Sequence, residues 1–221
     1  MQPPRKTGET AVLLLHGLCR TRRSMATMAR ALEGEGYLVL NPGYPSRKAD
    51  VRTLAQQSIT QALATFRRTG CTRLHVVTHS MGGILLRAFL AEEEVAELGH
   101  VVMLAPPNGG SELVDRLRHL PGFAWFNGPA GLELGTGTDG LPGQLGPAAF
   151  SVGIIAGSRC RDPFLSRLLP RPNDGKVSVE RTRLAGMRDF LELPYGHTFL
   201  MNRPEIISQT VHFLKKGFFC R

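Results

Sequence analysis

Residues Leu74–Gly83 combine an apolar, β-branched run with a tight turn that carries a serine. An apolar segment of helical character, Ile84–Leu90, follows at once. Strand, sharp turn and helix are the context in which a serine hydroxyl is held exposed at the C-terminal edge of a sheet. There the Ser80 oxygen can attack a carbonyl carbon, and the Met81 N–H at the helix start can stabilise the resulting oxyanion. The stretch therefore predicts a serine nucleophile.

A serine nucleophile needs a base, because a free hydroxyl is a poor nucleophile near neutral pH. Of the seven histidines, His197 is the best candidate, since it follows the last expected strand in the loop Pro194–Phe199. A loop leaving the carboxyl edge of a parallel sheet reaches the edge that carries Ser80. We expect His79, the neighbour of the serine, to point away and pack beside the turn.

The base in turn needs a carboxylate, which fixes its tautomer and stabilises the imidazolium ion. Asp174 heads a short Asp-Gly turn between the last two expected strands and is the preferred candidate. Asp162, in the loop after the fifth strand, and Glu180 are the competing candidates.

A second oxyanion donor is expected in the loop after the first strand. In the sequence His16–Leu18, Gly17 allows a close backbone approach, and the Leu18 N–H can point inward. Together with the Met81 N–H, this gives two donors to one oxyanion.

The elements that must position these residues alternate between strand and helix. Such a pattern is typical of a mostly parallel sheet covered on both faces by helices. Strands are expected at 11–16, 37–40, 74–79, 101–105, 152–156 and 190–193. Helices are expected at about 22–35, 50–70, 81–94 and 204–216, with a short one near 112–119. We therefore predict a single α/β domain over residues 1–221.

Residues 107–150 interrupt this alternation, because they hold ten glycines and five prolines, too many for long regular elements. One interpretation is an irregular loop whose aromatic side chains complete the core. The other is a cap-like insertion over the serine that lines an apolar pocket. In the second interpretation the pocket residues are Phe123, Trp125 and Phe126, together with His16 at the end of the first strand.

Composition sets limits on the remaining classes of function. The chain has 221 residues and a net charge of +9, but its basic residues are scattered and accompany no nucleic-acid-binding motif. The apolar run Ala11–Leu15, behind the basic segment Met1–Lys6, is too short for a signal-peptide core. The four cysteines form no zinc-binding or disulfide pattern. We expect a cytoplasmic protein with no nucleic-acid partner.

The order Ser80, Asp174, His197, with His16–Leu18 upstream, resembles the α/β-hydrolase family over roughly residues 11–213. Within the family it looks most like the small lipase and esterase group, because 173–180 and 105–112 are similar to that group's acid-bearing loop and to a segment following its serine-bearing half. The family fold has an eight-stranded sheet, and this chain lacks the first two strands. One departure is Thr78, which stands where the G-x-S-x-G motif has its first glycine.

The resemblance implies hydrolysis of carboxylic esters through a Ser-His-Asp triad and an acyl-enzyme, without a metal or an organic cofactor. The apolar residues of the 107–150 segment favour a small, hydrophobic ester as substrate. A thioesterase, an amidase or an acyltransferase would use the same triad and stays open. So do a non-catalytic binding module and weak association with anionic membranes through Phe213–Phe219. The sequence leaves the oligomeric state and the acyl-chain length open.

Overall fold

A parallel sheet forms the centre of the molecule in the computed structural model, which describes residues 9–160, 162 and 166–221. The segment Met1–Lys6 lies outside the described residues. The strands follow the order β2-β1-β3-β4-β5-β6, and every neighbouring pair is parallel. Their bounds are β1 Thr10–Leu15, β2 Leu38–Leu40, β3 Arg73–His79, β4 Leu98–Leu104, β5 Val152–Gly157 and β6 Asp189–Leu193. The predicted six-stranded α/β fold is thereby confirmed.

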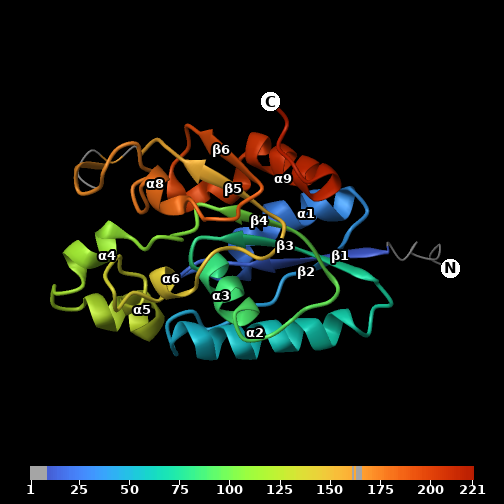
Figure 1. Cartoon of the computed structure of the whole chain (residues 1–221), viewed down its shortest axis with the longest axis horizontal. Helices are drawn as coiled ribbons and strands as arrows, with labels where there is room; N and C mark the ends of the chain where they lie inside the picture. Colours follow the sequence, from blue (N-terminus) through green and yellow to red (C-terminus); the bar gives the residue numbers. More distant parts are fainter. Residues whose placement is uncertain (1–8, 161, 163–165) are drawn as a thin grey trace.

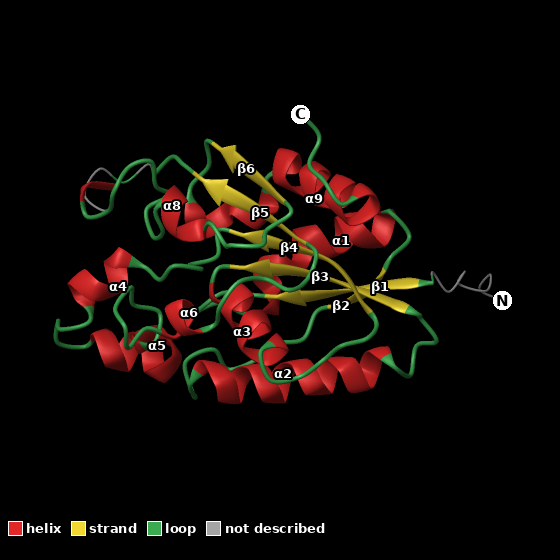
Figure 2. Ribbon diagram, in the orientation of Figure 1, coloured by secondary structure: helices red, strands yellow, loops and turns green. Residues whose placement is uncertain are grey.

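Helices cover both faces of this sheet, with α2 and α3 on one face and α1 and α9 on the other (Figures 1 and 2). The helices that the structure describes are η1 Arg22–Met25, α1 Ala26–Gly34, α2 Val51–Phe66, α3 Met81–Leu90, α4 Glu112–Leu117, α5 Phe123–Leu132, α6 Leu141–Gln144, α8 Val179–Thr182, η2 His197–Asn202 and α9 Pro204–Lys216. The helix expected at 22–35 is divided into the 3₁₀ turn η1 and the helix α1.

The sheet is buried on both faces, which is why its strands read as continuous apolar runs. Strand β1 shows this directly, because Leu13 and Leu15 pack towards α2 and α3, whereas Val12 and Leu14 pack towards α1 and α9. Alternate side chains of one strand therefore belong to two separate cores. These two cores fix the strand register, and with it the edge at which Ser80 emerges.

Helices α4 and α5 of the segment 107–150 lie beyond the carboxyl ends of the strands, whereas α6 lies beside α3 (Figure 1). Helix α5 is kinked because Gly128 has a φ of 68° and Pro129 follows it. The buried Arg87 of α3 anchors this segment by donating to the carbonyl oxygens of Asn108, Pro142 and Gly146.

The C-terminal apolar segment packs largely against the sheet. Phe213 and Phe219 are buried in the core beside α1 and α9, whereas Phe218 is exposed. Among the described residues, no helix has both the length and the apolar composition that crossing a bilayer requires.

Helix α3 approaches the end of β1 so closely that Gly82 has no room for a side chain. A Cβ atom there would lie 2.5 Å from the Leu15 carbonyl oxygen and 2.9 Å from that of His16. Because both obstacles are backbone atoms, we expect Gly82→Ala to lower the free energy of unfolding by about 1–3 kcal/mol or more. Urea denaturation measures this change.

Gly34 in α1 provides the matched control, since a Cβ there would meet nothing within 4 Å. Gly34→Ala should stabilise the protein by roughly 0.5–1 kcal/mol, the usual gain for a helical glycine. A Gly82→Ala variant as stable as the native protein would contradict the close approach of α3 to β1.

Candidate active site

Ser80 occupies the sharp turn between β3 and α3 with backbone angles of φ 53° and ψ −125°. Such a conformation is costly for a residue with a side chain and persists only where the surroundings enforce it. Two hydrogen bonds do so here, from the Ser80 N–H to the Leu104 carbonyl at 2.9 Å and from the Gly83 N–H to the Ser80 carbonyl at 2.9 Å. The turn therefore presents the hydroxyl at the edge of the sheet.

Thr78 replaces the glycine of the usual serine motif, and Gly83 makes room for it. The Thr78 side chain is fully buried, and a Cβ atom on Gly83 would lie 3.2 Å from its Oγ1. This Oγ1 has no hydrogen-bond partner among the described residues. The β-branched residue is accommodated because the first turn of α3 carries a glycine opposite it.

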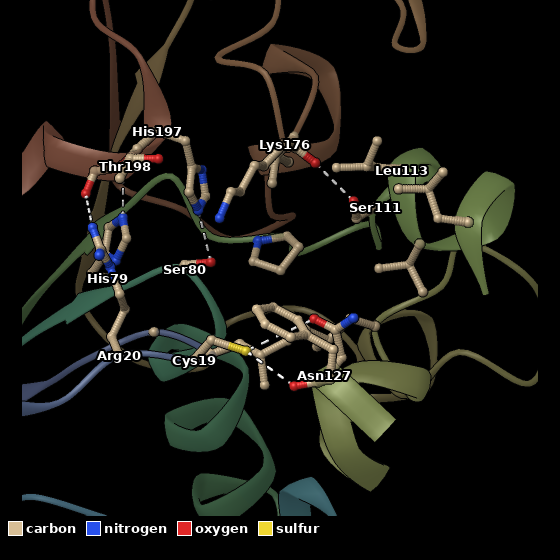
Figure 3. A pocket seen from close by; sticks show the side chains of 18 of the residues that line it. Cys19, Arg20, His79, Ser80, Ser111, Leu113, Asn127, Lys176, His197 and Thr198 are labelled. Carbon is tan, nitrogen blue, oxygen red and sulfur yellow. Dashed lines mark hydrogen bonds between the residues drawn. The ribbon is translucent and has the colours of Figure 1, made fainter. Parts of the chain in front are cut away.

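His197 lies between Ser80 and Asp174, and a chain of two hydrogen bonds joins the three side chains. The Ser80 Oγ is 3.0 Å from His197 Nε2 (Figure 3), and His197 Nδ1 is 2.7 Å from Asp174 Oδ2. The imidazole ring and the carboxylate are almost fully buried, because the His197 side chain is 4 % exposed and that of Asp174 is 0 % exposed. Three residues distant in the sequence thus converge on one edge of the sheet.

The Asp-Gly turn holds the carboxylate in place. Asp174 Oδ1 accepts hydrogen bonds from the N–H groups of Lys176 at 2.9 Å and Val177 at 2.8 Å, which leaves Oδ2 for the histidine. The Asp174 carbonyl also accepts the His197 N–H at 3.1 Å. Of the competing candidates, Glu180 pairs with Arg183 at 3.5 Å, and Asp162 borders the same hollow as His197, but the carboxylate that bonds His197 Nδ1 is that of Asp174.

His79 supports the backbone of His197, a role that the sequence did not reveal. Its Nε2 is 3.1 Å from the His197 carbonyl oxygen, and the two rings lie 4.9 Å apart (Figure 3). The ring is buried, and desolvation holds its pKa well below 6.5, with a further lowering by His197. A neutral His79 can donate one proton to this carbonyl, so it positions the base from behind.

Two backbone N–H groups are available beside the serine. Leu18 lies in the loop after β1, and no hydrogen bond joins its N–H to another described residue. Met81 begins α3, whose first N–H groups have no partner within the helix. Gly17 lets the two segments approach, since a Cβ atom there would lie 3.1 Å from the Ser80 Cβ.

A pocket of about 320 Å³ opens over the serine. Its apolar wall comes from α4, α5 and the segment that follows them, through Leu113, Val114, Leu117, Phe123, Phe126 and Leu134. Phe123 and Phe126 were expected there, but His16 and Trp125 do not line this pocket. His16 is fully buried and stacks on Tyr44 at 3.9 Å, whereas Trp125 lies on the outer side of α5 with 84 % of its surface exposed.

Sequence reasoning also missed the polar lining of the pocket. Arg20, Ser111 and Lys176 border it, and a basic residue after the Asp-Gly turn was the available signal for Lys176. Among the residues that the structure describes, no group of three or more His, Cys, Asp or Glu side chains is placed to hold a metal ion. The arrangement can supply a nucleophile, a base and oxyanion donors from the chain itself.

The chain belongs to the alpha/beta hydrolase family, whose model matches residues 12–212. This match covers most of the chain and includes the serine, the histidine and the carboxylate described above. A comparison of the sequence with curated proteins finds no significant match.

Solved structures of lipases and related hydrolases share the fold. The mature lipase BlEst2 of Bacillus licheniformis superposes with a TM-score of 0.70 at 19 % identity, covering 98 % of this chain and 94 % of that one. The phospholipase PlaB of Legionella pneumophila gives 0.64 at 23 % identity over 79 % of this chain and 45 % of its own. Lipase B of Aspergillus fumigatus gives 0.68 at 16 % identity over 96 % and 54 %. At these identities the likeness establishes the fold alone.

The buried His79 should make the protein less stable in acid. Its pKa is well below 6.5 in the folded chain and close to 6.5 in the unfolded chain. The unfolded state therefore binds more protons below that pH, and the free energy of unfolding falls as the pH drops. We expect His79→Gln to flatten this decline between pH 6.5 and 5 in urea titrations.

His119 is exposed and serves as the control, because His119→Gln should leave the slope of the native protein unchanged. Equal slopes for the native protein and His79→Gln would contradict a neutral, buried His79.

Proposed function

We propose that this chain is a serine hydrolase that cleaves carboxylic esters through an acyl-enzyme. The observation that carries the proposal is the continuous hydrogen-bond chain from Ser80 through His197 to Asp174, at 3.0 Å and 2.7 Å. The Ser80 end of these hydrogen bonds faces a largely apolar pocket, beside the Leu18 N–H, which has no hydrogen-bond partner among the described residues. The relatives in fold include lipases, which agrees with this reading without identifying the substrate.

The reaction follows from the geometry in two halves. In the first, Ser80 Oγ attacks the ester carbonyl while His197 Nε2 takes its proton, and the oxyanion is stabilised by the Leu18 and Met81 N–H groups. His197 then returns the proton to the leaving alcohol, which leaves the acyl group on the serine. In the second half a water molecule, deprotonated by His197, releases the acid and restores Ser80. Asp174 stays ionised and stabilises the imidazolium ion.

Loss of either reacting residue should abolish turnover without unfolding the chain. We expect Ser80→Ala and His197→Ala each to lower kcat/KM for p-nitrophenyl esters by ~10⁴ or more. Asp174→Asn should lower kcat/KM about 10³–10⁴-fold, because the asparagine amide would hold His197 in the wrong tautomer. The native protein should also be labelled by a fluorophosphonate probe, and Ser80→Ala should not.

Asp162→Asn is the control for the acid and should retain near-native turnover, because the carboxylate that bonds His197 is that of Asp174. A folded native sample that neither labels nor turns over any ester would contradict the proposal and favour a binding module.

The apolar wall predicts that esters with longer acyl chains are better substrates than acetate esters. Each buried methylene contributes about 0.8 kcal/mol, or up to about fourfold in kcat/KM, until the pocket is filled. A series of p-nitrophenyl esters of increasing acyl length measures this gain. We expect Phe126→Ala to reduce the gain for each methylene.

Phe218 is an exposed phenylalanine outside the pocket, so Phe218→Ala should leave the acyl-length profile unchanged. Equal turnover at all acyl lengths would contradict the proposal that the acyl chain binds in this pocket.

A further inference from the structure

The charged residues of the pocket wall are of one sign. Arg20 and Lys176 both line the pocket, and its described lining includes no aspartate or glutamate. Figure 3 shows the Lys176 side chain reaching towards Ser80 beside His197, with Leu113 farther out on the same side, whereas the Arg20 side chain lies by Thr198 on the far side of His79. The apolar wall of the pocket is therefore joined by a cation at Lys176, next to Ser80 and His197, and by a second at Arg20 on the border of the site.

Lys176 has a fixed backbone and an unpaired head group. Its N–H donates to Asp174 Oδ1 at 2.9 Å, and its carbonyl accepts the Ser111 hydroxyl at 2.7 Å. No ion pair or hydrogen bond joins its ammonium group to another described residue. Desolvation by the surrounding wall, and next Arg20, lower the pKa of this ammonium group, while Asp174 opposes them. The cost of desolvation would be offset by an anion bound beside it.

Arg20 is held at the border of the same region. Its Nη2 donates to the Thr198 carbonyl at 2.5 Å, and its guanidinium group lies 5.5 Å from the centre of the Phe199 ring. A guanidinium group has five N–H donors, so others remain for a ligand. A neighbouring hollow brings Arg23 next to Arg20. The cationic region thus continues outwards from the pocket.

Lys176 is exposed and Arg20 is half-buried, but both side chains border the hollow over Ser80 and not an open surface. Arg52, Arg67 and Lys215 each form an ion pair with a glutamate. Lys176 and Arg20 form none with any described residue, although they line a concave site. A second hollow beside His197 contains Arg159, Lys176 and Arg203 against two carboxylates, one of which is Asp174, already bound to His197.

We propose that Lys176 and Arg20 select esters whose alcohol portion carries an anionic group, a phosphate or a carboxylate. The inference rests on the proposed ester hydrolysis, because His197 must give its proton to the leaving alcohol, and the alcohol therefore lies on the His197 side. The acyl chain then occupies the apolar side formed by α4 and α5. One end of the substrate is recognised by burial of apolar surface and the other by charge-assisted hydrogen bonds.

Matched esters test this selection. Hexanoate esters of 4-hydroxybenzoate and 4-hydroxyphenyl phosphate carry an anion on the alcohol, whereas the hexanoate ester of 4-hydroxybenzamide is neutral and similar in size. The native protein should favour the anionic esters in kcat/KM, and the larger of the two preferences distinguishes phosphate from carboxylate. Lys176→Gln should lower the ratio of anionic to neutral kcat/KM about tenfold, the usual effect of one charge-assisted hydrogen bond.

Two further variants act as controls. Lys176→Arg keeps the positive charge and should retain most of the preference. Lys216→Gln removes an exposed lysine of α9 outside the pocket and should leave the ratio within about twofold of native, as expected for a distant surface charge. A native ratio of one or less, or an equal loss of both activities in Lys176→Gln, would overturn the inference while leaving ester hydrolysis intact.

A binding measurement separates this inference from the proposed function. Calorimetric titration of the Ser80→Ala chain with hexyl phosphate and with hexanol needs no turnover. Hexyl phosphate should bind more tightly than hexanol, and the added substitution Lys176→Gln should weaken its binding about tenfold. Indistinguishable binding of the two compounds would reject the anion site even if no ester is hydrolysed. If the phosphate binds but no ester is hydrolysed, the ester hydrolase proposal alone fails.

Discussion

The strained backbone of Ser80 is the constraint on which the rest of the site depends. A φ of 53° is available to a serine only because β3 enters the turn from a doubly buried sheet and α3 leaves it under close packing. Gly82 lets α3 touch the end of β1, and the same contact brings the Leu18 loop beside the nucleophile. The two cores of the molecule thus hold the Ser80 hydroxyl and the Leu18 and Met81 N–H groups in one fixed geometry.

Asp174 connects the catalytic geometry with the charge of the pocket. One carboxylate oxygen accepts His197, while the other accepts the N–H groups of Lys176 and Val177 and closes the turn. The turn that aims the carboxylate at the histidine therefore also aims the Lys176 side chain at the pocket (Figure 3). The alignment of Asp174 with His197 and the position of the Lys176 side chain are consequences of the same few hydrogen bonds.

Much of the fold could be predicted because a doubly covered parallel sheet leaves a strong signal. Its strands are apolar runs separated by helices and turn residues. The order of serine, acid and base in the family then indicated which loops after the strands carry the three residues. The division of the 22–35 helix left no such signal, because 3₁₀ and α turns share their short-range pattern. The structure of residues 107–150 could not be predicted either, because Arg87 anchors this segment through contacts between residues that are distant in the sequence.

Side-chain direction marks the limit of what sequence predicts about the site. Trp125 and Phe126 are neighbours on α5, yet only Phe126 faces the pocket, because successive residues on a helix point in different directions. A net charge of +9 likewise says nothing about which basic residues form ion pairs. Ion pairing separates Lys215, which pairs with Glu35 on the surface, from Lys176, which lines the pocket over Ser80 and forms no ion pair with a described residue. The proposed selection of anionic esters therefore depends on where the cations lie, which only the folded chain defines.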